Sequence, residues 1–136
     1  MVEVVQYRSI LVCVTQQKSC ERLIRKAAEL LAENGSLYVI HVSKENWNFF
    51  DNTRDGEAME YLFTVSKSYG ADLTILHSDR VVETIAQFAQ YNNVDVIVVG
   101  EAPEGSHNVF ASRLEQLLDD SDIKVSVIAS DSVKAC

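Results

Sequence analysis

The chain has 136 residues, 47% of them hydrophobic, and a formal net charge of -8 at pH 7. This length and apolar content predict one globular domain over residues 1–136, and an acidic balance without a stripe of Lys or Arg disfavours nucleic-acid binding. No apolar run approaches the roughly 20 residues that span a bilayer, and three cysteines without a signal-peptide pattern favour a cytoplasmic protein that does not enter a membrane.

Short apolar strands alternate with amphipathic helices through the first half of the chain. Residues 10–14 form the first predicted strand, and their pattern places Cys13 in the core. The following helix is expected to have Ser19 as its N-cap and to end at Gly35. Its predicted apolar face consists of Leu23, Ile24, Ala27, Ala28, Leu30 and Leu31.

The second predicted strand, residues 37–42, leads into a segment without a clear period. This segment, residues 43–56, carries Trp47, Phe49 and Phe50 among polar residues. Aromatic side chains in such a place more often pack onto the end of the sheet, and a lid or a subunit contact is the alternative.

Two more helices flank the third predicted strand, residues 72–77. The first helix covers residues 57–69 and ends at Gly70, and Asp79 is expected to cap the second. Core candidates on these helices are Met59, Leu62, Phe63, Val65, Val81, Val82, Ile85, Phe88 and Ala89.

The β-branched run at residues 94–99, broken only by Asp95, predicts a central strand with both faces buried, ending at Gly100. A helix with Leu114, Leu117 and Leu118 as its apolar residues then precedes the last strand, residues 123–129. Strands that alternate with helices in this way imply right-handed βαβ units and a parallel sheet covered by helices on both faces.

The position of Gly100 predicts where a ligand binds. In open α/β sheets, ligands bind outside the carboxyl ends of the strands. A glycine there lets main-chain N–H groups approach an anion, and the start of the next helix adds a partial positive charge. We hypothesise that Ser112 and Arg113 on that helix help to hold a phosphate, with a solvated helix face as the alternative.

Polar residues interrupt the last strand, as is typical of a sheet edge. Two interpretations stay open: the strand pairs with its copy in a second subunit, or it is a short edge that Lys124 protects.

The histidines do not form a metal site by spacing. His41 and His77 stand at strand ends, where hydrogen-bonded structural roles are expected, and His107 is expected in an exposed loop. The sequence also lacks a P-loop, a dinucleotide fingerprint and a nucleophile elbow. Because no general base, nucleophile or metal cluster converges, we expect no catalytic residues and no appreciable catalysis.

Several segments together resemble the universal stress protein domain, over residues 8–129. They are residues 10–14, residues 19–24, His41-Val42, residues 92–100 and the last strand. The resemblance implies a five-stranded, Rossmann-like parallel sheet in the order 3-2-1-4-5, with a crevice between the first and fourth strands. It also implies dimers formed through the fifth strand. Many relatives bind ATP or AMP in that crevice and act by regulation.

Within that family the chain looks most like the variant found in KdpD-type potassium-responsive sensor kinases and in small free-standing relatives. The feature that points there is Val12-Cys13-Val14, followed by a hydroxyl residue and then by residues 21–25. The resemblance implies a sensor kinase or another protein as a partner.

The match departs from ATP-binding relatives at three places. One is the end of their phosphate loop, where the nearest counterpart of the final Gly-Ser or Gly-Thr pair, Ala111-Ser112, arrives about two residues early. Those relatives carry an Asp where this chain has Thr15, and the second glycine of their phosphate loop is replaced by Pro103. Proline has no N–H to offer a phosphate, and Glu101 and Glu104 add charge of the wrong sign. The loop is therefore degenerate for ATP unless Mg²⁺ bridges these carboxylates.

The expected function is a non-catalytic sensing or regulatory module that binds AMP or ATP weakly and holds no metal of its own. Gly105 and Ser106 still allow a tight turn, Val42 offers main-chain contacts to a base, and Thr15 offers a hydroxyl. One alternative is an ATP-binding stress protein with slow hydrolysis, and a second is a partner-binding module with an empty crevice. The candidate nucleotide-binding residues are Thr15, Val42, Gly100, Gly105, Ser106, Ser112 and Arg113.

Overall fold

The computed structural model describes residues 6–14, 17–43, 53–100 and 109–128. In chain order the elements are β1 (Tyr7–Cys13), α1 (Gln17–Leu30), β2 (Leu31–Ser43), α2 (Thr53–Ser68), β3 (Asp72–His77), α3 (Val81–Tyr91), β4 (Val96–Gly100), α4 (Val109–Leu117) and β5 (Lys124–Ile128). All the strand pairs are parallel, and the five-stranded sheet has the order β3-β2-β1-β4-β5. The predicted α/β class and strand order are therefore confirmed.

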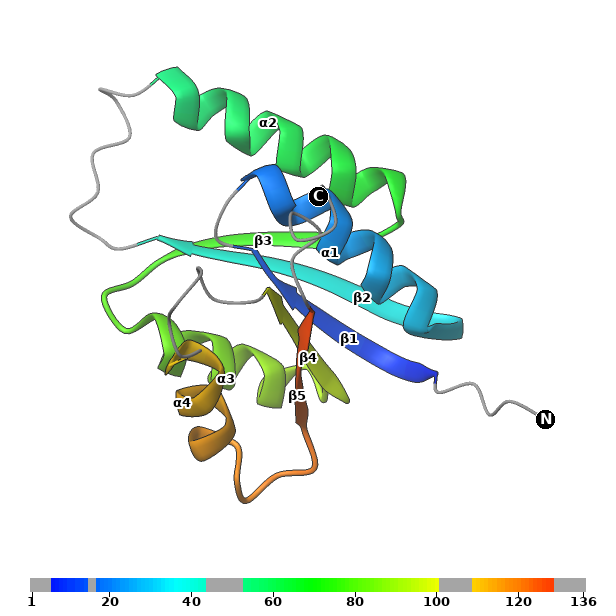
Figure 1. The fold of residues 1–136 in the computed structure, drawn as a ribbon, viewed down its shortest axis with the longest axis vertical. Helices are drawn as coiled ribbons and strands as arrows, with labels where there is room; N and C mark the ends of the chain where they lie inside the picture. The colour runs from blue at the N-terminus through cyan, green and yellow to red at the C-terminus, as the bar shows by residue number, and fades with distance from the viewer. Residues whose placement is uncertain (1–5, 15–16, 44–52, 101–108, 129–136) are drawn as a thin grey trace, which may run out of the picture.

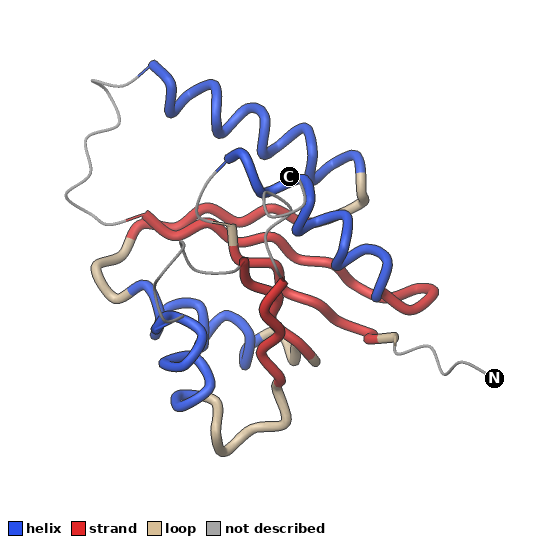
Figure 2. Tube along the Cα trace, viewed as in Figure 1, coloured by secondary structure: helices blue, strands red, loops and turns tan. Residues whose placement is uncertain are grey.

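Helices cover both faces of this sheet. Figure 1 shows α1 and α2 on one side and α3 and α4 on the other, and Figure 2 shows the strands, in red, between the two helical layers. Right-handed crossovers place α1 and α2 on one face while the sheet grows from β1 to β3. The chain then returns past β1 to add β4 and β5, so α3 and α4 lie on the opposite face.

Successive residues of the central strands serve two separate cores. Ile10 and Val12 pack with α1 and α2, whereas Leu11 and Cys13 pack with α3 and α4. Side chains alternate between the two faces of a strand, so a strand that is covered on both faces must be apolar throughout. The same reason explains the run in β4, where residues 96–99 are all buried. The predicted core position of Cys13 is confirmed.

The connection between α1 and β2 differs from the prediction. Ser19 lies inside α1 instead of capping it, and α1 ends before Gly35. Leu31, predicted on the apolar face of the helix, is the first residue of β2. The left-handed residue here is Asn34, with a φ of 66°. Gly35 is required for space instead, because a Cβ at this position would lie 2.9 Å from the carbonyl oxygen of Arg8 in the neighbouring strand.

Two residues predicted in the core are exposed. Phe63 on α2 is 56% exposed, and Leu117 at the end of α4 is 45% exposed. Consecutive helical side chains point about 100° apart, so the neighbour of a buried residue can lie outside the helix face that covers the sheet. On α2 the buried positions are Leu62 and Val65, as predicted, and the Phe63 ring instead lies 5.9 Å from Nζ of Lys67.

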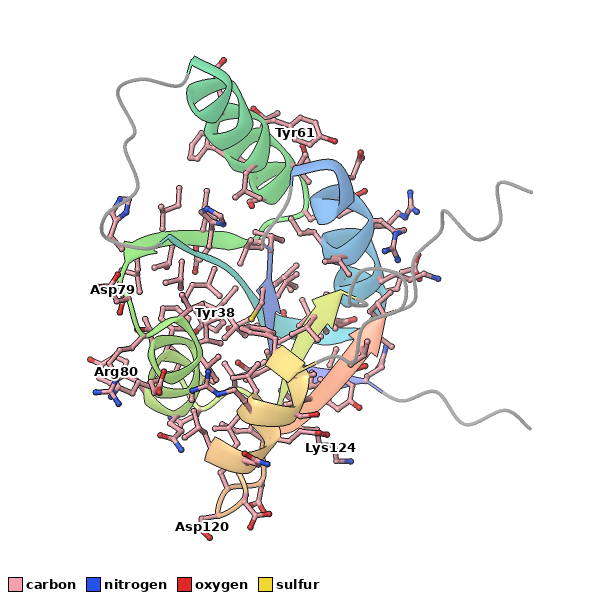
Figure 3. The ribbon with its side chains drawn as sticks, turned by 60° about the vertical axis from the view of Figure 1, so that its left-hand side comes forward. Tyr38, Tyr61, Asp79, Arg80, Asp120 and Lys124 are labelled. Carbon is pink, nitrogen blue, oxygen red and sulfur yellow. The ribbon has the colours of Figure 1, made fainter. Side chains whose placement is uncertain are left out.

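The two ends of β3 carry different turn chemistry. Gly70 has a φ of 69° two residues after the end of α2, which confirms it as the stop of that helix. Asp79 does not cap α3, because Arg80 occupies the cap position (Figure 3). The Ser78 hydroxyl accepts from the Arg80 N–H at 3.0 Å, and the Thr84 hydroxyl donates to the Arg80 carbonyl at 2.7 Å.

Asp95 joins three strands at their amino-terminal ends. Its carboxylate accepts hydrogen bonds from the N–H groups of Arg8 and Ser9 at 3.0 and 3.1 Å. Its own N–H donates to the Ser9 carbonyl at 2.8 Å, and its carbonyl accepts from the Lys124 N–H at 3.1 Å. A carboxylate is well suited to this place, because charge-assisted bonds to main-chain donors are stronger than neutral ones.

Strand β5 forms one edge of the sheet, as the polar pattern of its sequence predicts. Val127 on this strand is 46% exposed. Among the helices of the described segments, none has both the length and the apolar composition that crossing a bilayer requires.

Candidate functional site

The carboxyl ends of β1 and β4 form the switch point of the sheet. The two strands are neighbours, and their register pairs Ile10 with Val96, Leu11 with Ile97 and Val12 with Val98. The helices that follow them leave to opposite faces, α1 toward α2 and α4 toward α3 (Figure 1). In open α/β sheets this is the place where ligands bind. The predicted site therefore lies at the position that the observed topology favours.

Residue Val14, directly after β1, is held in place by β2. Its N–H donates to the Ile40 carbonyl at 3.1 Å, and its carbonyl oxygen lies 2.9 Å from Nδ1 of His41. Because a carbonyl oxygen only accepts hydrogen bonds, Nδ1 carries the proton in this contact. The expected structural role of His41 is thereby confirmed, and the main chain that leads to position 15 is anchored at the switch point.

Val42 lies next to His41 near the carboxyl end of β2, where it pairs with Leu76 of β3. Its half-buried side chain packs against the core under α3 and α4. Val42 thus lies at the carboxyl ends of the strands, as the ends of β1 and β4 do, and its main chain is one strand away from Val14.

Gly100 is the last residue of β4 and pairs with Ile128 of β5. A Cβ built on it would lie 3.4 and 3.8 Å from the two δ-carbons of Leu23, which is ordinary van der Waals contact. Its φ also lies outside the left-handed region. As far as the described residues show, neither space nor backbone conformation requires a glycine here, in contrast to Gly35 and Gly70.

Ser112 and Arg113 are exposed near the start of α4. The guanidinium of Arg113 contacts α3, where its Nη2 lies 3.5 Å from Oε2 of Glu83. The same carboxylate oxygen lies 3.7 Å from Nη2 of Arg80. The amino end of a helix favours anions, so this surface combines a helix start with two cations and one carboxylate.

Several predicted residues fall outside the described segments. They are Thr15, Trp47, Phe49, Phe50, Glu101, Pro103, Glu104, Gly105, Ser106, His107, Ala129 and, as a side chain, Met59. Of the candidate nucleotide-binding residues, the structure therefore places four: Val42 and Gly100 at the carboxyl edge of the sheet, and Ser112 and Arg113 on the helix that follows β4.

The titratable groups of the site give no indication of a metal centre. Within the described ranges, no three His, Cys, Asp or Glu side chains come close enough together to hold a metal ion. Burial raises the pKa of the Cys13 thiol, which keeps this side chain protonated and inert beneath the site. His77 is exposed at the end of β3.

Two residues with evident roles were not singled out by the sequence patterns. Asp95 interrupts an apolar run just before the central strand. A lone carboxylate in such a run indicates a side chain that accepts hydrogen bonds from main-chain N–H groups. Glu83 carries no such signal, because its partner Arg113 is 30 positions away on another helix. Only the packing of α3 against α4 brings that pair together.

The parallel order 3-2-1-4-5 and the switch point between β1 and β4 define an open α/β domain of the type that binds ligands at its carboxyl edge. A profile of the universal stress protein family matches residues 6–129. The chain belongs to the universal stress protein family. Among curated protein sequences, none is significantly similar to it.

Solved structures show the same fold at low sequence identity. A hypothetical protein, solved as a test case of structural genomics, has a TM-score of 0.65 at 16% identity and covers 93% of this chain and 98% of its own. A universal stress protein in complex with cAMP has a TM-score of 0.63 at 15% identity, covering 91% and 98%. The universal stress protein from Archaeoglobus fulgidus in complex with dAMP has a TM-score of 0.58 at 20% identity, covering 93% and 99%.

Proposed function

We propose that this protein is a non-catalytic sensing or regulatory module that binds an adenine nucleotide weakly at the carboxyl ends of β1 and β4. The observation that carries the proposal is Gly100, which stands at the switch point although neither its φ nor the described residues around it demand a glycine. Close approach of a ligand to the main chain is one physical reason for a glycine at such a place. The complexes of similar structures with cAMP and dAMP support an adenine nucleotide as that ligand.

The residues around the site support weak binding. Pro103 lacks the N–H that a glycine offers at that point of the phosphate loop, and Thr15 replaces the acidic residue of ATP-binding relatives. Two glutamates, Glu101 and Glu104, follow β4 and repel a polyphosphate unless Mg²⁺ lies between them. AMP, with the fewest negative charges, fits such a site better than free ATP.

The proposal also covers the protein's partner, its compartment and its oligomeric state. A KdpD-like module would act in the cytoplasm with a sensor kinase or another protein partner, and the sequence Val12-Cys13-Val14 supports this assignment within the family. A homodimer through β5 is supported by the position of this strand at the sheet edge and by the 46% exposure of Val127.

Isothermal titration calorimetry with adenosine, AMP and ATP, with and without Mg²⁺, tests the proposed function. The expected result is a dissociation constant for AMP above about 10 µM, corresponding to roughly -7 kcal/mol or weaker. Low-micromolar binding of Mg-ATP would contradict the weak-binding proposal and favour an ATP-binding stress protein. The absence of any binding at millimolar concentrations would leave the partner-binding module with an empty crevice. Phosphate release, followed in parallel, is expected to stay at background.

A further inference from the structure

Glu83 stands between two arginines that come from different elements. It lies in the first turn of α3, and its Oε2 is 3.5 Å from Nη2 of Arg113 on α4 and 3.7 Å from Nη2 of Arg80. The Glu83 side chain is 27% exposed, whereas those of Arg113 and Arg80 are 55% and 77% exposed. Figure 3 shows Arg80 at the start of α3, directed away from the body of the molecule. The Glu83 carboxylate is therefore the least exposed of the three charged groups.

The contact with Glu83 occupies N–H donors of Arg113 that a bound phosphate would need. Arg113 lies one turn into α4, where the helix start favours an anion, and it donates through Nη2 to Glu83. A guanidinium binds carboxylates and phosphates through the same planar set of N–H donors. A phosphate that recruits Arg113 must therefore displace Glu83 or share the guanidinium with it.

The carboxylate also acts at a distance. Charges separated by less than a Debye length, about 10 Å at ordinary ionic strength, still interact through partly screened solvent. If the ligand phosphates lie at the start of α4, each added phosphate brings more negative charge there. The unfavourable interaction with Glu83 then grows from AMP to ATP and is absent for adenosine.

We propose that Glu83 competes with the ligand phosphate for Arg113 and thereby sets a preference for nucleotides with few phosphates. This inference rests on the proposed nucleotide binding at the switch point and adds its specificity. Glu83 is a positioning residue in this scheme, because it acts on the ligand through Arg113. Removing its charge leaves Arg113 and Arg80 without a carboxylate between them and makes the surface more attractive to polyphosphates.

The test is a double-mutant cycle read by calorimetry at low salt. The variants are Glu83→Gln, Arg113→Gln and the pair together, each titrated with adenosine, AMP and ATP. Glu29→Gln serves as the matched control, because Glu29 is exposed on α1, on the opposite face of the sheet, and loses the same charge. Thermal melting of each variant reports folding separately.

The expected result is tighter ATP binding by Glu83→Gln, roughly two- to fivefold, the range that one exposed ion pair is worth. AMP should gain less and adenosine nothing. Most of the gain should disappear when Arg113→Gln is present, and only the part that comes from the long-range repulsion by Glu83 should remain. Glu29→Gln should bind all three ligands as the unmodified protein does.

Two outcomes would contradict the inference in different ways. If adenosine binds every variant equally while Glu83→Gln binds ATP no better than the unmodified protein, Glu83 has only a structural role; the proposed nucleotide site then stands and the competition fails. If neither the unmodified protein nor any variant binds adenosine, AMP or ATP, the proposed function itself fails and the specificity built on it fails as well.

Discussion

The substitution Gly100→Ala tests whether this glycine is needed for ligand binding or for packing, because the two roles predict different changes in affinity and in stability. In Gly100→Ala the new methyl group would lie 3.4 Å from the nearest δ-carbon of Leu23, and among the described residues, chain neighbours apart, Leu23 alone comes within 4 Å. The backbone conformation is one that alanine adopts, since φ at this position is not left-handed. Replacing glycine by alanine at a compatible position stabilises a protein by about 0.4–1 kcal/mol, mainly by restricting the unfolded chain.

The same methyl group is expected to weaken nucleotide binding. If the ligand approaches the main chain at the end of β4, the added carbon disturbs at least one hydrogen bond to a charged oxygen. Such a bond is worth about 1.5–3 kcal/mol, so the affinity for AMP should fall about tenfold or more. Gly100→Ala should therefore be slightly more stable than the unmodified protein in urea denaturation, and a weaker binder in calorimetry.

Gly70→Ala provides the opposite signature and serves as the control. Gly70 has a φ of 69° and nothing within 4 Å of a built Cβ, so only backbone strain opposes the substitution. A non-glycine residue in this conformation costs about 1–2 kcal/mol, and the position follows α2, at the amino-terminal side of β3. We expect lower stability and unchanged affinity. A Gly100→Ala protein that binds AMP as tightly as the unmodified one would contradict a ligand contact at Gly100.

Two further predictions concern the frame that supports the site. Asp95→Ala should lower the free energy of unfolding by about 2–4 kcal/mol in urea denaturation, because the N–H groups of Arg8 and Ser9 lose a charged acceptor. A loss below about 0.5 kcal/mol would show that water replaces the carboxylate. The raised pKa of Cys13 predicts that stability falls as the pH rises above the ordinary thiol pKa, because only the unfolded chain then releases the proton. This contribution approaches about 1.4 kcal/mol per pH unit and should be missing in Cys13→Ala, so equal slopes for the two proteins would contradict it.

Fold prediction from the sequence succeeded where one physical rule dominates. A strand buried on both faces must be apolar throughout, so the runs in β1 and β4 identified central strands without any knowledge of their neighbours. Handedness of the crossovers and alternation of elements constrain the sheet to parallel pairing, and the resemblance supplied its order. The position of Gly100 at the end of a central strand was likewise predictable.

The errors arose where a local signal competed with tertiary contacts. Ser19 and Asp79 are good capping residues by type, yet Ser19 lies inside α1, and Arg80 rather than Asp79 occupies the cap position of α3. Gly35 is a typical helix stop, but the structure uses it for close approach to Arg8. Phe63 has the apolar character of a core residue and lies on the wrong side of its helix.

What the sequence determined by itself is therefore the alternation of elements and the two central strands, because these depend on periodicity. It also predicted, from the end of one strand, where on the sheet a ligand would bind. Only the tertiary structure decided which side chains meet there. The bond from His41 to Val14 and the pairing of Glu83 with Arg113 join residues that are distant along the chain, and the parallel packing of separate βαβ units brings them within bonding distance.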